Sequence, residues 1–201
     1  MTVHGRYTGI LRDDLASAFD ADAQDFPGVD FTDGLYRANL RRTQCGGNLS
    51  ALTTEVMLAT ALFLREGDVV TNLTFHSATT AAGTPANWWF ALYSSAATPA
   101  LLAQTADQTT TAWAANTTMT KALSAPVTIS ATGVYYAAIM VKAATPPTLV
   151  GVAMHHANVS DGVLTGDAVL SQTSGSALAA TAPATIATPT AVANVPLVIA
   201  T

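Results

Sequence analysis

The chain has 201 residues, of which 50% are hydrophobic and 10% are charged, and its formal net charge is −5. Soluble chains carry about 25% charged residues, so this composition leaves an unusually neutral surface and predicts that much of it is buried in an assembly. The acidic balance disfavours a nucleic-acid partner, which would require a basic patch. The longest apolar run, 56–64, is shorter than the ~20 residues that cross a membrane, so the sequence predicts no membrane-spanning helix.

Charge is distributed unevenly along the chain. Residues 1–68 hold 16 of the 21 charged residues, and residues 69–201 hold the remaining five. This contrast predicts two regions, an N-terminal docking arm over residues 1–60 and a β-sandwich domain over residues 61–201. The polar start of the chain lacks the apolar core of a secretory signal, which predicts a soluble protein made in a cytoplasm. The single cysteine, Cys45, excludes an intrachain disulfide and is expected to be a small buried side chain.

The arm is expected to be extended, with short helical pieces. Asp13 can cap a helix whose apolar side begins with Leu15 and Phe19, and a Phe-Pro-Gly sequence at 26–28 then ends it. Isolated apolar anchors of this kind suit an arm that lies in a groove on a partner or a neighbouring subunit, or one that packs on its own sandwich. The candidate partner-docking residues are Leu15, Phe19, Phe26, Phe31, Leu35, Tyr36, Arg37, Arg41 and Arg42.

From residue 69 onward the pattern becomes that of β-strands. Val69, Thr71, Leu73 and Phe75 alternate with other residues and are expected on one face of a strand. Short segments with similar features, separated by turn residues, are typical of an antiparallel β-sandwich with a jelly-roll-like arrangement. The predicted strands are 69–76, 88–93, 101–105, 117–123, 134–142, 149–154 and 195–200.

The segment 171–190 is rich in Ser, Ala, Thr and Pro. It either lies on the sandwich as an ordered extended chain or is mobile. The ordered form is favoured, because the apolar strand 195–200 beyond it needs anchoring.

The β region offers few groups for catalysis. His155 and His156 are adjacent, so on a regular strand they would point to opposite faces and could not bind one metal together. Asp161-Gly162 and Gly166-Asp167 are typical of turns rather than of a calcium loop. The sequence therefore predicts a protein that is not an enzyme and that has no catalytic residues, metal or cofactor.

Aromatic side chains offer a different possibility, a platform that stacks on sugars. Packing in the core is the favoured alternative, because alternation places one residue of each adjacent pair inside a sandwich. The candidate aromatic residues are Trp88, Trp89, Trp113, Tyr93, Tyr135 and Tyr136.

Five segments and one tryptophan resemble a β-domain of virion proteins from tailed phages of actinobacteria. They are the runs at 65–73, 88–93 and 101–105, followed by Trp113 with the runs at 133–138 and 149–151. The resemblance spans roughly residues 60–155 and rests on the order of strands and turns. It implies a structural role and brings no catalytic residues.

The resemblance, with the short arm, implies a capsid decoration or minor capsid protein that binds and stabilises an assembled shell in the virion. The alternative is a minor tail or fibre protein that binds host surface glycans. The expected partners are copies of the chain itself, as a homotrimer, together with the major capsid protein or, in the alternative, tail proteins. An enzyme acting on cell-wall polymers would need clustered acids that the sequence does not supply.

Overall fold

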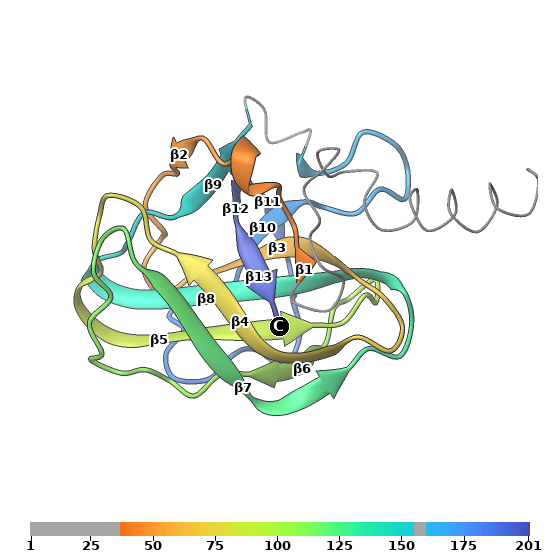
Figure 1. Cartoon of the computed structure of the whole chain (residues 1–201), viewed down its shortest axis with the longest axis horizontal. Helices are drawn as coiled ribbons and strands as arrows, with labels where there is room; N and C mark the ends of the chain where they lie inside the picture. Colours follow the sequence, from red (N-terminus) through yellow and green to blue (C-terminus); the bar gives the residue numbers. More distant parts are fainter. Residues whose placement is uncertain (1–36, 155–159) are drawn as a thin grey trace, which may run out of the picture. The chain divides into compact units, whose positions relative to one another are not determined.

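The computed structural model describes residues 37–154 and 160–201, and these form antiparallel β-sheets (Figure 1). This confirms the all-β, antiparallel prediction. The helical pieces expected near Leu15 lie outside the described residues. The described elements are β1 (Arg37–Ala38), the 3₁₀ helix η1 (Arg42–Gln44), β2 (Gly47–Asn48), β3 (Met57–Leu64), β4 (Val69–His76), β5 (Gly83–Tyr93), β6 (Leu101–Gln104), β7 (Thr118–Thr128), β8 (Gly133–Thr145), β9 (Val150–Ala153), β10 (Ser171–Ser174), β11 (Thr190–Ala191), β12 (Asn194–Pro196) and β13 (Val198–Ala200).

The strands form three sheets. The largest has the order β11-β10-β3-β8-β5-β6, the second has the order β1-β13-β4-β7, and the smallest has the order β12-β9-β2. In Figure 1, β4 and β7 cross in front of β5 and β8, so the two larger sheets lie as two layers. This arrangement is sandwich-like.

A long two-stranded ribbon joins the two layers. β3 and β4 follow one another in the chain and pair antiparallel with β8 and β7, which also follow one another. Where the ribbon passes from one sheet to the other, the Gly67 N–H donates to the Ile129 carbonyl (2.9 Å) and the Ile129 N–H donates to the Asp68 carbonyl (2.8 Å). The backbone pairing is therefore continuous through the bend.

The core lies between the two larger sheets. Its apolar side chains come from β3, β5 and β8 on one side and from β4, β7 and β13 on the other. Phe75 of β4 meets Phe90 of β5 with ring centroids 4.7 Å apart, and Trp88 meets Trp113 at 5.1 Å. Aromatic pairs at such distances stabilise the packing beyond the area they bury.

The strand 69–76 has the predicted bounds, but its first residues face differently from the prediction. The pairing of β4 with β7 shifts register between Val70 and Asn72. Leu73 and Phe75 are buried as expected, whereas Val69 is 52% exposed and Val70 is buried in its place. The register passes from Val70 opposite Val127 to Asn72 opposite Ala122, so Thr71 stands against four residues of β7, and this odd difference of three reverses the side-chain alternation.

Two features of the strand set differ from the sequence prediction. β3 lies within the apolar run 56–64 and was not predicted as a strand, because it shows no alternation and consists mostly of Leu, Ala and Met, which favour helices. The single strand expected at 195–200 is two strands, β12 and β13, which pair with β9 and β4 in different sheets.

The described unit begins at Arg37. Residues 37–60, which the sequence analysis placed in the arm, contribute β1, β2 and the first half of β3. β1 pairs with β13, and the Asn39 side chain donates to the Pro196 carbonyl (2.8 Å). These residues are therefore hydrogen-bonded to the C-terminal part of the chain.

Residues 175–187, called the strap below, cover the outer face of the six-stranded sheet. Leu178, Ala182 and Ile186 pack there with side chains of β3, β5 and β8 in a second apolar cluster. At its two ends the strap is held by backbone hydrogen bonds from the Leu178 N–H to the Glu55 carbonyl (3.0 Å) and from the Ile186 N–H to the Pro99 carbonyl (2.9 Å). The favoured prediction of an ordered extended segment is confirmed.

Candidate interaction surface

The predicted docking residues divide into two groups. Arg37, in β1, donates from Nε and Nη2 to the Asp68 carboxylate at 3.2 and 3.0 Å, which ties β1 to the turn between β3 and β4. Arg41 precedes η1 and Arg42 begins it, and the Arg42 side chain is exposed. The other six lie outside the described residues: Leu15, Phe19, Phe26, Phe31, Leu35 and Tyr36.

The aromatic residues considered for sugar stacking do not reach the surface. Trp88 lies in the core between the sheets, and Trp89 lies on the opposite face under the strap, so the adjacent pair is divided as alternation predicts. Each indole N–H has a backbone acceptor, the Thr111 carbonyl for Trp88 (2.9 Å) and the Ala179 carbonyl for Trp89 (2.7 Å). All six candidates are buried: Trp88, Trp89, Trp113, Tyr93, Tyr135 and Tyr136. They form no exposed platform.

The polar groups considered for chemistry are two adjacent histidines and the single cysteine. His155 and His156 lie outside the described residues. Cys45 is half-buried, and this burial raises the pKa of its thiol, which disfavours the reactive thiolate at neutral pH. Within residues 37–154 and 160–201, no cluster of three or more His, Cys, Asp or Glu side chains has the spacing to hold a metal ion. No helix in this part of the chain is long and apolar enough to span a bilayer.

A shallow pocket of about 230 Å³ lies beside β2 and β9. Its lining has no ionisable side chain and consists of Gln44, Gly46, Gly47, Asn48, Leu49, Gly151, Val152 and Ala153. The close approach of β9 and β12 here requires glycine, since a Cβ at Gly151 would lie 2.2 Å from the Val195 carbonyl oxygen. The pocket has no acid, base or nucleophile for catalysis.

Residues 160–171 form a loop that projects from the unit, called the braced loop below. At its base, Ser160 Oγ donates to the Ser171 carbonyl and accepts from the Ser171 N–H, both at 3.0 Å. The Leu170 carbonyl accepts the Ala61 N–H of β3 at 2.8 Å, which fixes the loop to the sheet. A loop of this length with its two ends close together is an Ω-loop.

Asp167 organises the outer part of the braced loop. One of its carboxylate oxygens accepts the backbone N–H groups of Val163 (3.0 Å) and Leu164 (2.8 Å), and its own N–H donates to the Leu164 carbonyl (3.1 Å). Gly162 and Gly166 have φ values of +100° and +94°, which glycine adopts without strain. The predicted turn chemistry at these residues is therefore present.

The tip of the braced loop carries Val163 and Leu164, which are 73% and 74% exposed. They are the most exposed large apolar side chains in the described part of the chain. The hydrogen bonds to Asp167 hold their backbone in place while their side chains face solvent.

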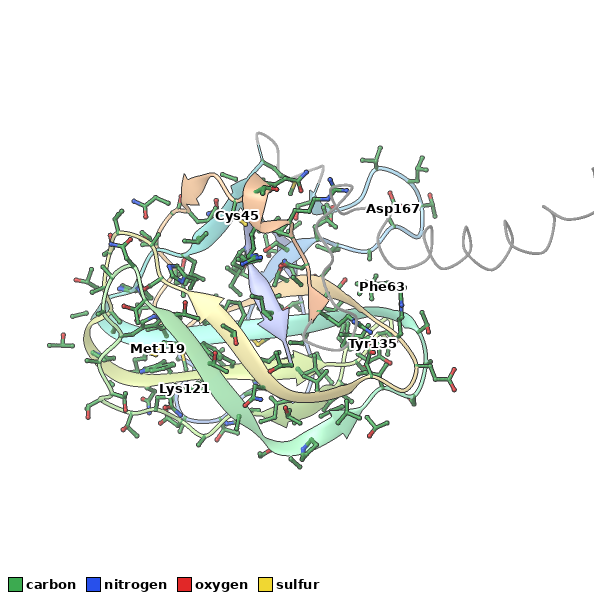
Figure 2. The ribbon with its side chains drawn as sticks, in the orientation of Figure 1. Cys45, Phe63, Met119, Lys121, Tyr135 and Asp167 are labelled. Carbon is green, nitrogen blue, oxygen red and sulfur yellow. The ribbon has the colours of Figure 1, made fainter. Side chains whose placement is uncertain are left out.

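A second exposed apolar area lies where β3 ends and β8 begins. Phe63 of β3 is directly opposite Val134 of β8, and it is 54% exposed. Leu170, which extends the pairing of β10 with β3 by one residue opposite Ala61, lies on the same face and is also exposed. Phe63, Val134 and Leu170 are called the Phe63 corner below. Figure 2 labels Phe63 and Asp167, and both lie toward the right-hand side of that view.

The sequence did not predict that the tip of the braced loop and the Phe63 corner are exposed apolar surfaces. The apolar run 56–64 signalled Phe63, and the two Asp-Gly turn pairs signalled the loop, but neither indicates which side chains stay exposed. Exposure depends on what covers each face, and the strap covers the sheet as far as Met57, Trp89 and Tyr93 but leaves Phe63 open.

A scan of the chain against protein-family models gives no match, and a search of curated proteins gives none either.

Proposed function

We propose that this chain is a non-enzymatic structural protein of a phage virion, specifically a capsid decoration or minor capsid protein that binds and stabilises an assembled shell. The observation that carries the proposal is the braced loop, which presents Val163 and Leu164 to solvent on a unit with few charges. Exposed apolar side chains on a rigid support are typical of protein interaction sites. The phage assignment itself rests on the resemblance of the strand and turn segments in residues 60–155.

We infer further that the sandwich-like arrangement is a jelly roll that lacks two of the usual eight strands. Support comes from the order β3-β8-β5-β6 in one sheet, from the neighbours β4 and β7 in the other, and from the ribbon that joins them. Jelly-roll domains are a common architecture of viral capsid proteins. This inference is therefore consistent with a role in a shell.

The proposed partners are copies of the chain itself, as a homotrimer, and the major capsid protein. Few charges lie in residues 69–201, so burying this surface costs little desolvation. A minor tail or fibre protein would use the same surfaces against tail proteins. Glycan binding through Trp88 or Trp89 is not supported, because both side chains are buried.

The test is the location of the chain in purified particles of the phage that carries its gene. Heads and tails are separated and probed with an antibody against the chain, with the major capsid protein and a tail-tube protein as markers. We expect many copies on heads. Detection on tails alone would replace the decoration role with the tail alternative, and absence from washed particles would overturn the virion role.

A second arm of the test concerns docking. Shells that lack the chain are mixed with the full chain or with a variant that begins at Arg37, so that β1 and its ion pair with Asp68 are kept. If residues 1–36 dock on the shell, the full chain will co-sediment with it and the shortened chain will not. Equal co-sedimentation would exclude a docking role for these residues.

A further inference from the structure

We propose that the tip of the braced loop of one copy docks on the Phe63 corner of a second copy of this chain. This inference rests on the proposed self-association and identifies the surfaces that would carry it. Four of the six exposed large apolar side chains in the described residues belong to these two features: Phe63, Val163, Leu164 and Leu170. Removing them from water is the main source of favourable free energy in protein association.

The braced loop is preorganised for docking. Ser160 closes its base and is fully buried, and the Asp167 carboxylate holds the backbone of Val163 and Leu164 at its tip. Little conformational entropy is therefore lost when the tip binds, which raises the affinity of a small contact.

The Phe63 corner is a suitable receptor for an apolar tip. Phe63 and Val134 face each other across the β3–β8 pair, and Leu170 continues the same face on the neighbouring strand. The three side chains are apolar, so docking of Leu164 against them would leave no polar group unpaired between them.

The charge of the loop favours a protein partner over a lipid surface. Asp161 and Asp167 flank the tip, and residues 160–171 contain no Lys or Arg. An anionic membrane attracts basic segments and repels acidic ones, so it disfavours this loop. A second copy presents the Phe63 corner at the same concentration as the loop itself.

The edge of the four-stranded sheet is poorly suited to self-association. β7 is the edge strand, and its Lys121 ammonium lies 5.1 Å from the centroid of the Trp88 ring in the core. Pro126, in the same strand, has no N–H to donate. Inward-pointing lysine and proline are features that prevent pairing of edge strands. Association is therefore expected through side chains of the loop and the corner.

The contact joins two different surfaces, so two copies can satisfy it reciprocally in a two-fold dimer, and three or more copies can satisfy it head to tail in a ring. The proposed trimer is the smallest such ring, and a reciprocal dimer that both surface variants dissociate would support the same contact. The two apolar surfaces nucleate an interface that must grow to about 1,200–2,000 Å² in total to be stable. Asp161 and Asp167 beside the tip, and Arg65 and Glu66 beside Phe63, would lie toward its rim.

The first experiment measures the mass of the full chain by sedimentation velocity from 1 to 100 µM. We expect a trimer, with the dissociation constant raised at least tenfold by Val163→Ser/Leu164→Ser and, independently, by Phe63→Ser. Val69→Ser is the matched control, because Val69 is 52% exposed but lies in β4 outside both features, and it should leave the constant unchanged. Circular dichroism checks whether each variant is folded. If one of the two surface variants does not fold, the other still tests the contact.

The second experiment tests the pairing directly in a Cys45→Ser background. Chains carrying Phe63→Cys and chains carrying Leu164→Cys are mixed and oxidised, and we expect a disulfide between the two kinds of chain. The control mixture of Val69→Cys with Leu164→Cys should give at least tenfold less.

The outcomes distinguish this inference from the proposed function. A monomer at 100 µM, or a trimer that both surface variants leave intact, overturns the docking of the loop on the corner. In either case the virion role is still decided by the particle experiment. Cross-linking equal to that of the control also overturns the pairing.

Discussion

Two serines at the base of the braced loop differ in how their hydroxyl groups are paired. Ser160 Oγ makes two hydrogen bonds with the backbone of Ser171, whereas the buried Ser171 Oγ has no partner among the described residues. Ser160→Ala leaves the buried Ser171 N–H without its partner, which costs about 1–3 kcal/mol, while the Ser171 carbonyl keeps its hydrogen bond from the Val192 N–H (3.0 Å). Ser171→Ala removes a buried group that has no such bond, so the free energy of unfolding should be unchanged or slightly higher.

Urea denaturation of the full chain measures this difference. Ser160→Ala should lower the midpoint and Ser171→Ala should not. Equal losses in the two variants would contradict the hydrogen-bond assignment.

Tyr93 makes stability depend on alkaline pH. Its ring lies under the strap, its hydroxyl donates to the Pro183 carbonyl (2.9 Å), and burial raises the pKa of the phenol well above its usual range. Above the unfolded value of about 10, the unfolded chain loses this proton while the folded chain keeps it, so stability falls as pH rises.

In Tyr93→Phe the free energy of unfolding should fall less steeply with pH than in the unmodified chain. The difference in slope between pH 10 and 11 should be up to about 1.4 kcal/mol per pH unit. Burial also raises the pKa of Tyr136, so some dependence remains in the variant. Urea denaturation at pH 8, 10 and 11 measures the two slopes. Parallel slopes would show that the Tyr93 phenol is not protected from ionisation in the folded state.

At the same scale, the position of the bulge in β4 could not be predicted from the sequence. Val69 and Val70 are chemically identical neighbours, and only the pairing with β7 decides which one faces the core. Local alternation gives the right face for Leu73 and Phe75, because regular pairing continues there.

Among the elements, one of the several links between the strap and the sheet under it is a buried indole. Trp89 donates to the Ala179 carbonyl, and Trp88, its neighbour, donates to the Thr111 carbonyl on the other side of the sheet. Trp89→Phe removes a hydrogen bond and part of the packing under the strap. The strap should then open more often, whereas Trp88→Phe should affect the loop at 105–117.

Hydrogen exchange read by mass spectrometry separates these effects. We expect exchange of residues 175–187 to be at least tenfold faster in Trp89→Phe than in Trp88→Phe, since a loss of about 1.4 kcal/mol in local stability is a factor of ten in opening. Equal exchange in the two variants would show that the strap opens only with the whole domain.

Strands were predicted where aromatic and β-branched residues gather between turn residues. β5 and β8 contain such segments, 88–93 and 134–142, although both of these strands are covered on both faces. β3 is also covered on both faces, but it consists mostly of Leu, Ala and Met, which favour helices and give no strand signal. The break between β12 and β13 depends on the two different partner strands and is not visible locally.

For the whole molecule, the apolar character of the proposed contact sets how association responds to salt. Charged residues lie near the proposed contact, Asp161 and Asp167 beside the tip and Arg65 beside Phe63, but the side chains that form the contact, Leu164 and Phe63, are apolar. Screening weakens interactions between charges and leaves apolar contacts largely unaffected. The dissociation constant of the trimer should therefore change by less than about threefold between 50 and 500 mM NaCl, as followed by sedimentation. A tenfold weakening in high salt would indicate that ion pairs carry the contact.

At this scale the sequence predicted the all-β fold class. It also predicts that the chain assembles, which stays a prediction, and it does not indicate which surface would carry an assembly. Composition reports how many neutral residues there are, and it does not report their location. The placement of Leu170 beside β3 depends on pairing between residues more than a hundred positions apart.

The strap has a consequence for the order of events during synthesis. Trp89 and Tyr93 leave the ribosome long before residues 175–187, which cover them in the finished protein. During that interval an aromatic face of the growing chain is exposed, and exposed faces of this kind are where partly made proteins aggregate. A chain that ends before residue 175 would retain β1 to β10 and leave this face permanently uncovered, and we expect such a chain to aggregate more readily than the full chain.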